Sequence, residues 1–289
     1  MKRTLASVVF VLLSVALASN ASAQLLVAKD GPIVYGHHHL SASNMDAQRK
    51  FFVDTLGGTD IKVGTNNAEI IKFPNVFIFF RQMAPTGGTK GTTVNHIGFS
   101  VPNLRMMVDK VKANGYRMIT REEVAADRAV KDDIAPPAAP GGATIAFAMG
   151  PDDTKVELVE NTSQTMPIAL HHVHFFNPQN SDMQQWYVKV FGAKPGQGAA
   201  GAVPPATLPG VSLNFNPSPT PVVGTQGRAV DHIGFEVKNL EEFCKKLETV
   251  GIKIERPYTK VEALNIAIAF IKDPWGTYIE LTEGLDKIQ

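Results

Sequence analysis

The four-residue sequence His-Ile-Gly-Phe occurs twice in this chain, starting at residue 96 and again at residue 232. When the segment 95–104 is laid over 231–240, seven of ten residues are identical at an offset of 136. A second pair of similar segments, 145–160 and 268–283, repeats at an offset of 123. This internal repeat predicts two copies of one structural unit. The difference in offset indicates an insertion in the first copy, around residues 122–142, which we expect to form a surface loop.

A shorter period lies inside each copy, because a short alternating strand followed by an amphipathic helix occurs four times. Asparagine or serine stands where each helix should begin, and a glycine follows each helix. The expected helices are 45–56, 104–114, 183–191 and 240–250, with N-caps at Asn44, Asn103, Ser181 and Asn239. With the β-type runs between them, they predict four strand-helix-strand-strand-strand modules of an α+β protein.

We expect two consecutive modules to form one domain. The predicted boundaries are a first domain at 24–160, a linker at 161–167 and a second domain at 168–289. Residues 1–23 have the anatomy of a secretory signal peptide, with Lys2 and Arg3 before an apolar run and Ala21-Ser22-Ala23 at its end. The run is short for a membrane anchor. We therefore expect cleavage after Ala23 and export to the periplasm or the medium.

The charge balance excludes some classes of partner. Without Lys2 and Arg3, 26 of the 28 basic residues remain against 27 acidic ones, which leaves the mature chain at −1. Such a chain is not typical of proteins that bind nucleic acid or anionic membranes, and we expect no membrane association after signal cleavage. The single cysteine, Cys244, cannot form an intramolecular disulfide and is expected to be a buried thiol on a helix.

Two histidines and one glutamate are associated with each copy of the repeated motif. Two imidazoles and a carboxylate are a recognised set of metal ligands. The first two ligands are 59 residues apart in the first set and 60 apart in the second. The predicted ligands are His37, His96 and Glu157 in the first domain, and His172, His232 and Glu280 in the second.

The strand phase supports this prediction, because successive side chains of a strand point to opposite faces. His96 is in phase opposite to Ile97 and Phe99, and the other five ligands are likewise opposite to the apolar residues of their strands. His38 has the apolar phase and should not bind metal. A curved sheet with helices on its convex side would collect the ligands on its concave side. Gly98 and Gly234, two residues after the central histidines, would leave room there.

These residues resemble the vicinal oxygen chelate superfamily, which includes glyoxalases, bleomycin-resistance proteins and extradiol dioxygenases. The resemblance covers nearly the whole mature chain. It implies paired βαβββ modules that close into eight-stranded cups, with a metal bound by residues of the first, fifth and last strands. These strands correspond here to the six predicted ligands. The expected fold is therefore two glyoxalase/dioxygenase-like cup domains.

The resemblance also allows the chain to be compared with two groups of enzymes in the superfamily, glyoxalase I and the extradiol dioxygenases. The fourth ligand usual in glyoxalase I has no Glu or His equivalent in 73–81 or 208–216. Asp273-Pro274-Trp275-Gly276 resembles the closing part of the extradiol dioxygenase signature, but Phe270 replaces its tyrosine, and Phe147 is the equivalent residue of the first domain. The metal could be zinc, manganese or Fe(II), and export favours the first two over readily oxidised Fe(II).

Two functions remain open at this point. The first is an exported metal-dependent enzyme that acts on a small oxygen-rich molecule as a lyase, isomerase or dioxygenase, with Glu236 as its catalytic base. The second is a non-catalytic protein that binds a small molecule or metal, of the bleomycin-resistance type. Both need a small-molecule substrate or ligand. The substrate, the occupancy of each site and the oligomeric state, including a homo-oligomer, are left open by the sequence.

Overall fold

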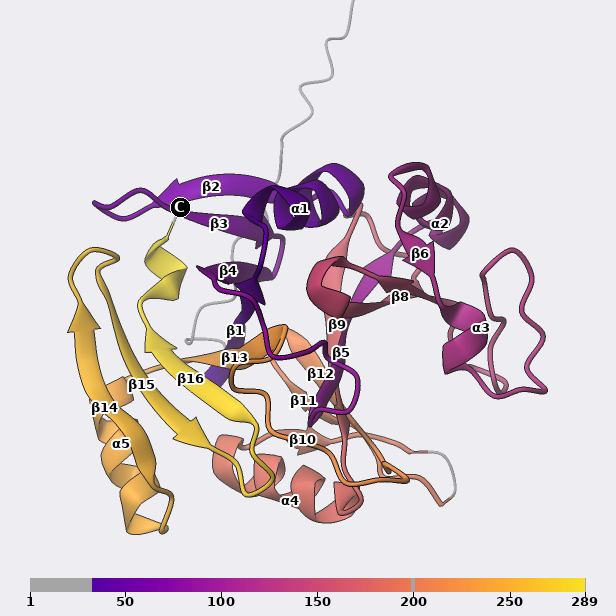
Figure 1. Cartoon of the computed structure of the whole chain (residues 1–289). Coiled ribbons are helices and arrows are strands. Elements are labelled where there is room, and N and C mark those ends of the chain that lie inside the picture. The colour runs from indigo at the N-terminus through magenta and orange to yellow at the C-terminus, as the bar shows by residue number, and fades with distance from the viewer. Residues whose placement is uncertain (1–32, 199–200, 289) are drawn as a thin grey trace, which may run out of the picture.

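A computed structural model describes residues 33–198 and 201–288 of the chain, so the predicted signal peptide lies outside the described residues. Two eight-stranded sheets dominate the structure (Figure 1). The first has the spatial order β14 (Ile254–Val261), β15 (Ile266–Lys272), β16 (Tyr278–Glu283), β13 (Val230–Val237), β1 (Ile33–Ala42), β4 (Val76–Gln82), β3 (Ala68–Phe73) and β2 (Thr59–Val63). The second has the order β10 (Lys194–Pro195), β11 (Ala206–Leu208), β12 (Val211–Asn216), β9 (Ala169–Phe176), β5 (Val94–Val101), β8 (Lys155–Glu160), β7 (Ile145–Met149) and β6 (Arg117–Met118).

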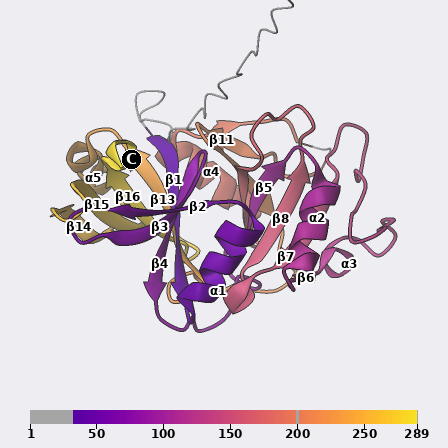
Figure 2. The same cartoon turned by 90° about the horizontal axis from the view of Figure 1, so that it is seen from above.

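The fold class is the predicted one, an α+β fold with two eight-stranded sheets, but the modules combine differently. The first sheet joins the first and fourth modules through the antiparallel pair β1 and β13, and we call it the terminal cup. The second joins the two middle modules through β5 and β9, and we call it the central cup. Figure 2 shows β14, β15 and β16 on one side of the molecule and β5, β8 and α2 on the other.

The prediction that the first two modules form one domain and the last two another was therefore wrong. The first domain of 24–160 contributes one module to each cup, and so does the second domain of 168–289. The segment 161–167 connects β8 to β9 inside the central cup, so it is not a linker between domains. Its Gln164 accepts a hydrogen bond of 2.6 Å from Ser100.

Apolar packing explains the exchange of modules. The first and second modules meet through their core faces, where the ring centroids of Phe73 and Phe99 are 4.8 Å apart. In the other half, Phe191 stacks on Phe235 at 4.5 Å. These contacts bury aromatic area between the cups. The concave face of each module is then completed by a different module. The first module pairs with the fourth, and the second with the third.

The helices lie where the sequence predicts them. They are α1 (Met45–Arg49), which continues as a π-helical segment (Lys50–Thr55), α2 (Leu104–Ala113), the short α3 (Thr120–Glu123), α4 (Asn180–Phe191) and α5 (Leu240–Thr249), together with short 3-10 turns at Pro151–Asp153 and Leu285–Lys287. Helix α2 packs on β6, β7 and β8, α4 on β11 and β12, and α5 on β14, β15 and β16. No helix in the described part of the chain is both long and apolar enough to cross a membrane.

Two of the four predicted N-caps are confirmed. The side chains of Asn44 and Asn103 accept hydrogen bonds from the backbone N–H groups three residues ahead. Ser181 instead lies within α4, and Asn239 makes no side-chain cap bond. Glu283 at the end of β16 caps α5 in its place, because its carboxylate accepts a bond of 2.9 Å from the Leu240 N–H.

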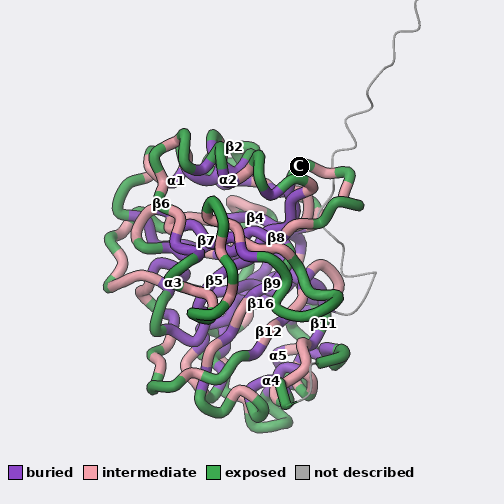
Figure 3. The backbone as a smooth tube through the Cα atoms, turned by 90° about the vertical axis from the view of Figure 1, so that its right-hand side faces the viewer, coloured by how far each residue is buried: buried purple, intermediate pink, exposed green. Residues whose placement is uncertain are grey.

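The core runs through both cups. Figure 3 shows the buried backbone concentrated in the central strands and the exposed backbone in the peripheral loops. Cys244 is buried on α5, as predicted, and burial raises the pKa of its thiol. His38 is fully buried, and its ring nitrogen is bonded to the Tyr35 hydroxyl at 2.8 Å, which confirms that it faces the core. Residues 124–144, which include most of the predicted insertion, are largely exposed.

Candidate metal centres

The terminal cup brings together His37 of β1, His232 of β13 and Glu280 of β16. The Nε2 atoms of both histidines lie 2.9 Å from the same oxygen, Oε2 of Glu280. The ligand atoms of the three residues are all within 4.8 Å of one another. Burial alone would raise the pKa of Glu280, but the hydrogen bonds and charges of the two histidines hold it well below its ordinary value. The carboxylate is therefore ionised and ready to bind a cation.

Strand register explains how these side chains meet. Gly234 pairs with His37 on one side and with Glu280 on the other. A methyl group at Gly234 would overlap the imidazole of His37. The glycine of the repeated motif therefore leaves room for a ligand side chain from the neighbouring strand, rather than for a bound molecule as the sequence suggested.

A further carboxylate orients His232. Its Nδ1–H donates a hydrogen bond of 2.6 Å to Asp231, whose other oxygen accepts from the Gly227 N–H at 2.6 Å. Burial lowers the pKa of His232, but Asp231 and Glu280 outweigh it and raise the pKa above the ordinary value. A carboxylate on the second ring nitrogen is the usual partner of a metal-binding histidine, because it fixes the ring orientation.

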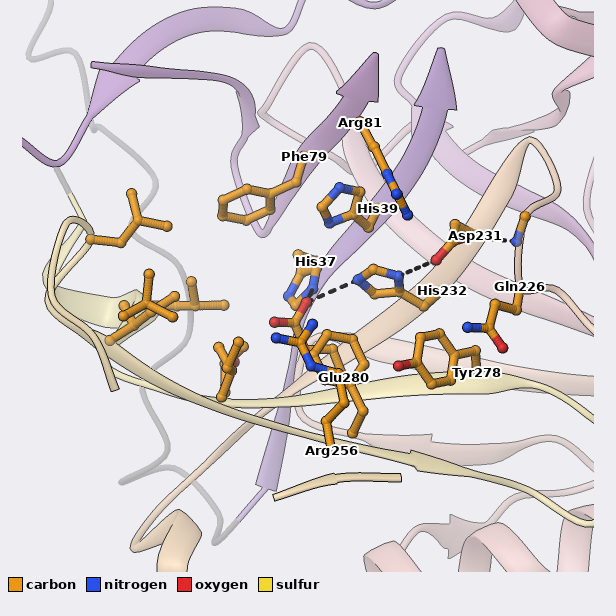
Figure 4. Close-up of a pocket in the computed structure, with 18 of the residues that line it drawn as sticks. His37, His39, Phe79, Arg81, Gln226, Asp231, His232, Arg256, Tyr278 and Glu280 are labelled. Carbon is orange, nitrogen blue, oxygen red and sulfur yellow. Dashed lines mark hydrogen bonds and ion pairs between the residues drawn. The ribbon is translucent and has the colours of Figure 1, made fainter. Parts of the chain in front are cut away.

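The three groups open into a cavity of about 670 Å³, which Figure 4 shows in close-up. His39, Phe79, Tyr278, Arg81 and Arg256 also line it. Burial, followed by the charge of His232, lowers the pKa of His39 to about 3, so its ring is neutral. A volume of this size suits a small organic molecule.

The central cup assembles the equivalent residues from the two middle modules. The Nε2 atom of His96 lies 2.8 Å from Oε2 of Glu157, and Nε2 of His172 lies 3.1 Å from the same atom. Gly98 pairs with both Glu157 and His172, and a methyl group there would overlap the His172 ring. Asn95 replaces the orienting Asp231, and its side-chain oxygen lies 3.0 Å from Nδ1 of His96.

This second site has a fourth member, His174, whose Nδ1 lies 3.0 Å from Nε2 of His96. The ligand atoms of all four residues are within 4.8 Å of one another. Among the residues that the structure describes, Nε2 of His174 has no hydrogen-bond partner although the atom is buried. Buried ring nitrogens without partners are costly, and a bound cation would satisfy them.

Lys155 is a buried lysine on the strand that carries Glu157. It stands two residues before Glu157, where the terminal cup has Tyr278 two residues before Glu280. Its side chain is only 2% exposed, and its ammonium lies 2.7 Å from Glu123 of α3 and 5.6 Å from the Phe147 ring centroid. Burial lowers the pKa of Lys155, and Glu123 opposes that effect. The central cup therefore has a paired lysine at the position where the terminal cup has a phenol.

The second half of the chain matches a known family. Residues 169–281 match the model of the Glyoxalase/Bleomycin resistance protein/Dioxygenase superfamily. The fold agrees with this match, because a glyoxalase I mutant from Zea mays superposes with a TM-score of 0.67 at 16% identity, covering 90% of this chain and 96% of that one. The segment 169–281 is thus similar to this superfamily, and the chain as a whole has the fold of glyoxalase I.

Two further comparisons show a similar fold and a short stretch of similar sequence. A putative dioxygenase from Bacillus subtilis has a TM-score of 0.59 at 12% identity, with 86% of this chain and 85% of that one covered. A lactoylglutathione lyase from Salmonella typhimurium is 37% identical over 60 residues, which are 21% of this chain. The match spans 44% of that relative, less than half of its length.

All six predicted ligands lie in the two clusters, but the sets are exchanged. His37 is grouped with His232 and Glu280, and His172 with His96 and Glu157. The reason is the module pairing, since each first-strand histidine lies across from the glycine of the module that completes its cup. Sequence reasoning missed His174, although it has the same strand phase as His172.

The prediction of Glu236 as a catalytic base does not agree with the structure. Glu236 is 2% exposed and is not among the residues that line the cavity. Its two oxygens accept hydrogen bonds from the Thr282 hydroxyl and from the N–H groups of Gly284 and Leu285. The strand phase of Glu236 was right, but the turn after β16 covers it, so its carboxylate holds that turn in place.

Proposed function

We propose that this protein is an exported, metal-dependent enzyme of the superfamily whose reaction takes place in the terminal cup. The observation that carries the proposal is the convergence of His37, His232 and Glu280 at a cavity of about 670 Å³. Two histidines and one carboxylate leave coordination positions open for a substrate, which is typical of catalytic rather than structural metal sites. The central cup offers a fourth ligand, His174, so an ion held there by all four groups fits a structural role better.

The residues present fit a divalent cation of the Zn²⁺ or Mn²⁺ type. Such an ion would polarise oxygen atoms of the substrate as a Lewis acid. Asp231 holds His232 in the orientation that turns Nε2 toward Glu280. Phe270 packs edge-on against His232 with 5.3 Å between centroids and limits the access of water from that side. The substrate is a small oxygen-rich molecule.

The wall of the cavity favours a lyase or isomerase over a dioxygenase that cleaves catechols. Phe270 stands where the resemblance to extradiol dioxygenases implies a tyrosine, and it has no proton to exchange. Tyr278, which stacks on Phe270 at 4.9 Å, provides a phenol on the cavity wall. Burial raises the pKa of Tyr278, so it is a proton donor rather than a base at neutral pH.

Metal analysis of the mature protein tests the proposal. We expect about two equivalents of a divalent metal per chain, of which one is lost in His37→Ala. The control is His39→Gln, which changes a histidine of the same strand that is outside the cluster and should keep both equivalents. Protein that is isolated without metal and binds none from buffer would contradict the proposal.

Export is tested separately. Sequencing the N-terminus of protein recovered outside the cytoplasm should give Gln24 as its first residue if the signal peptide is cleaved as proposed. Recovery of the full-length chain only in the cytoplasm would contradict export while leaving the metal site untouched.

A further inference from the structure

The cavity of the terminal cup is apolar at one end and polar at the other. Its apolar end is formed by β14, β15 and the segments next to them, with the side chains of Val261, Leu264, Ile266, Ile268 and Leu285. Figure 4 shows the polar residues Arg81, Gln226 and Tyr278 together on the other side of Glu280. The metal ligands lie between the two ends. A molecule that fills the cavity therefore needs a polar and an apolar part.

Two arginines distinguish this cavity from the rest of the molecule. The structure describes eight arginines, and six of them donate hydrogen bonds to carboxylates or carbonyl oxygens, namely Arg49, Arg105, Arg117, Arg121, Arg128 and Arg228. Arg81 and Arg256 have no hydrogen bond or ion pair to any described residue, and both line the cavity. The two guanidinium groups are therefore available to a ligand.

Their positions place both groups near the metal ligands. Arg256 of β14 pairs with Phe270 of β15, and its guanidinium carbon lies 4.8 Å from the centroid of that ring. Phe270 in turn packs against His232. Arg81 comes from β4, which pairs with β1 on the other side of the cup. Figure 4 shows both arginines pointing toward the ligands from opposite walls.

The charges of the cavity favour an anion. Its fixed negative charges are the carboxylates of Glu280 and Asp231, and the two arginines balance them. A divalent ion at the ligands would leave the cavity with an excess of two positive charges. Guanidinium groups bind carboxylates through charge-assisted hydrogen bonds in a planar arrangement.

We propose that the ligand of the terminal cup is an organic acid with an apolar chain or ring. Arg81 and Arg256 bind its anionic group, adjacent oxygen atoms face His37, His232 and Glu280, and the apolar part lies against Leu264 and Ile268. The contact of the oxygen atoms with metal rests on the proposed function. The preference for an acid rests on the two arginines and is independent of it.

Three related probes test this inference by calorimetry with the mature protein, before and after loading with Zn²⁺. They are 2-hydroxyoctanoate, 1,2-octanediol, which lacks the charge, and lactate, which lacks the tail. We expect 2-hydroxyoctanoate to bind at least about ten-fold more tightly than either of the others, since a charge-assisted hydrogen bond contributes about that factor. In Arg256→Gln and Arg81→Gln the preference over the diol should fall by about ten-fold.

Matched variants separate this result from a loss of folding. Arg105→Gln, on α2 and away from the cavity, should keep the full preference, and Leu264→Ser should weaken binding of 2-hydroxyoctanoate while leaving lactate unchanged. Melting temperature and metal content are measured for every variant. Equal binding of acid and diol, an unchanged preference in both arginine variants, or no binding of any probe overturns the inference.

The outcomes also distinguish this inference from the proposed function. A protein without metal that still prefers the acid through Arg81 and Arg256 would overturn the metal-dependent enzyme and support the acid ligand. A protein that holds metal at His37, His232 and Glu280 but binds the diol as tightly as the acid would do the reverse.

Discussion

The terminal and central cups carry the same ligand pattern on the same strands, but what lies in front of the ligands differs. In the terminal cup, His37, His232 and Glu280 face a cavity of about 670 Å³. In the central cup, Lys155 stands where the terminal cup has Tyr278, and His174 joins the equivalent ligands. A duplicated site can therefore keep its ligand geometry in both copies while the residues around the ligands diverge.

The largest expected effect comes from removing the central histidine of each cup. His232→Ala should lose one metal equivalent and reduce the metal-dependent binding of 2-hydroxyoctanoate by about 100-fold or more, because it removes a ligand next to the substrate. His96→Ala should also lose one metal equivalent and lower the melting temperature, but leave that binding unchanged. Metal analysis and calorimetry on the same samples test this. Loss of binding in His96→Ala would place the substrate in both cups.

A methyl group on either motif glycine is the next largest perturbation. Gly234→Ala should displace His37, and Gly98→Ala should displace His172, each at a cost of about 2 kcal/mol in the free energy of unfolding, as for overpacked cores. Denaturant unfolding measures both. The comparison predicts that Gly234→Ala also weakens binding of the probe, whereas Gly98→Ala changes stability alone. Two unchanged unfolding curves would show that the strands can move apart without cost.

Lys155 and Tyr278 occupy equivalent positions and should respond differently. Lys155→Met leaves Glu123 paired only with Lys90, at 2.6 Å, and should destabilise the fold by about 1–3 kcal/mol, less than for a fully unpaired buried charge. Adding Glu123→Leu should restore most of the loss. Tyr278→Phe removes a hydroxyl that makes no side-chain hydrogen bond to a described residue, and should stay within about 0.5 kcal/mol of the wild type. Equal losses in the two single variants would contradict a stabilising role of Lys155 that Tyr278 does not share.

A pH dependence of stability is also expected, and it is confined to the terminal cup. Burial raises the pKa of Glu236 to about 7, whereas the central cup has Ser100 at this position. The folded state therefore holds a proton that the unfolded chain releases near its ordinary pKa of 4.5. This contribution to stability is complete below pH 4.5 and is lost as the pH rises through about 7.

The variant Glu236→Gln isolates this contribution. The unfolding free energy of the wild type should fall relative to that of Glu236→Gln by about 1–3 kcal/mol between pH 5 and pH 8. Ser100→Ala is the control and should show the same pH profile as the wild type. Parallel profiles of wild type and Glu236→Gln would show that Glu236 keeps an ordinary pKa.

Much of this architecture follows from local patterns in the sequence. The repeat, the helices, the caps at Asn44 and Asn103 and the six ligands depend on spacing and strand phase, which act over a few residues. The pairing of modules does not follow from local patterns. Four modules with the same pattern can combine in more than one way and still bury the same faces. Contacts such as Phe73 with Phe99 decide it, and they join residues whose spacing carries no signal.

The roles of single polar residues also could not be predicted from the sequence. Strand phase places Glu236 and His174 on the ligand-bearing face, but it does not tell which segment covers that face. The turn at Gly284 and Leu285 covers Glu236. The arginines of the cavity lie on β4 and β14. These two strands belong to one sheet only because the first and fourth modules pair.

The pairing of β1 with β13 also sets the order in which the two sites can form during synthesis. The central cup uses strands from the middle of the chain, so it can close while the last module is still being made. His37 must wait for Glu280, which follows it by 243 residues. A chain that stops before β16 can complete only the central site. The terminal site forms only after β16 has been synthesised.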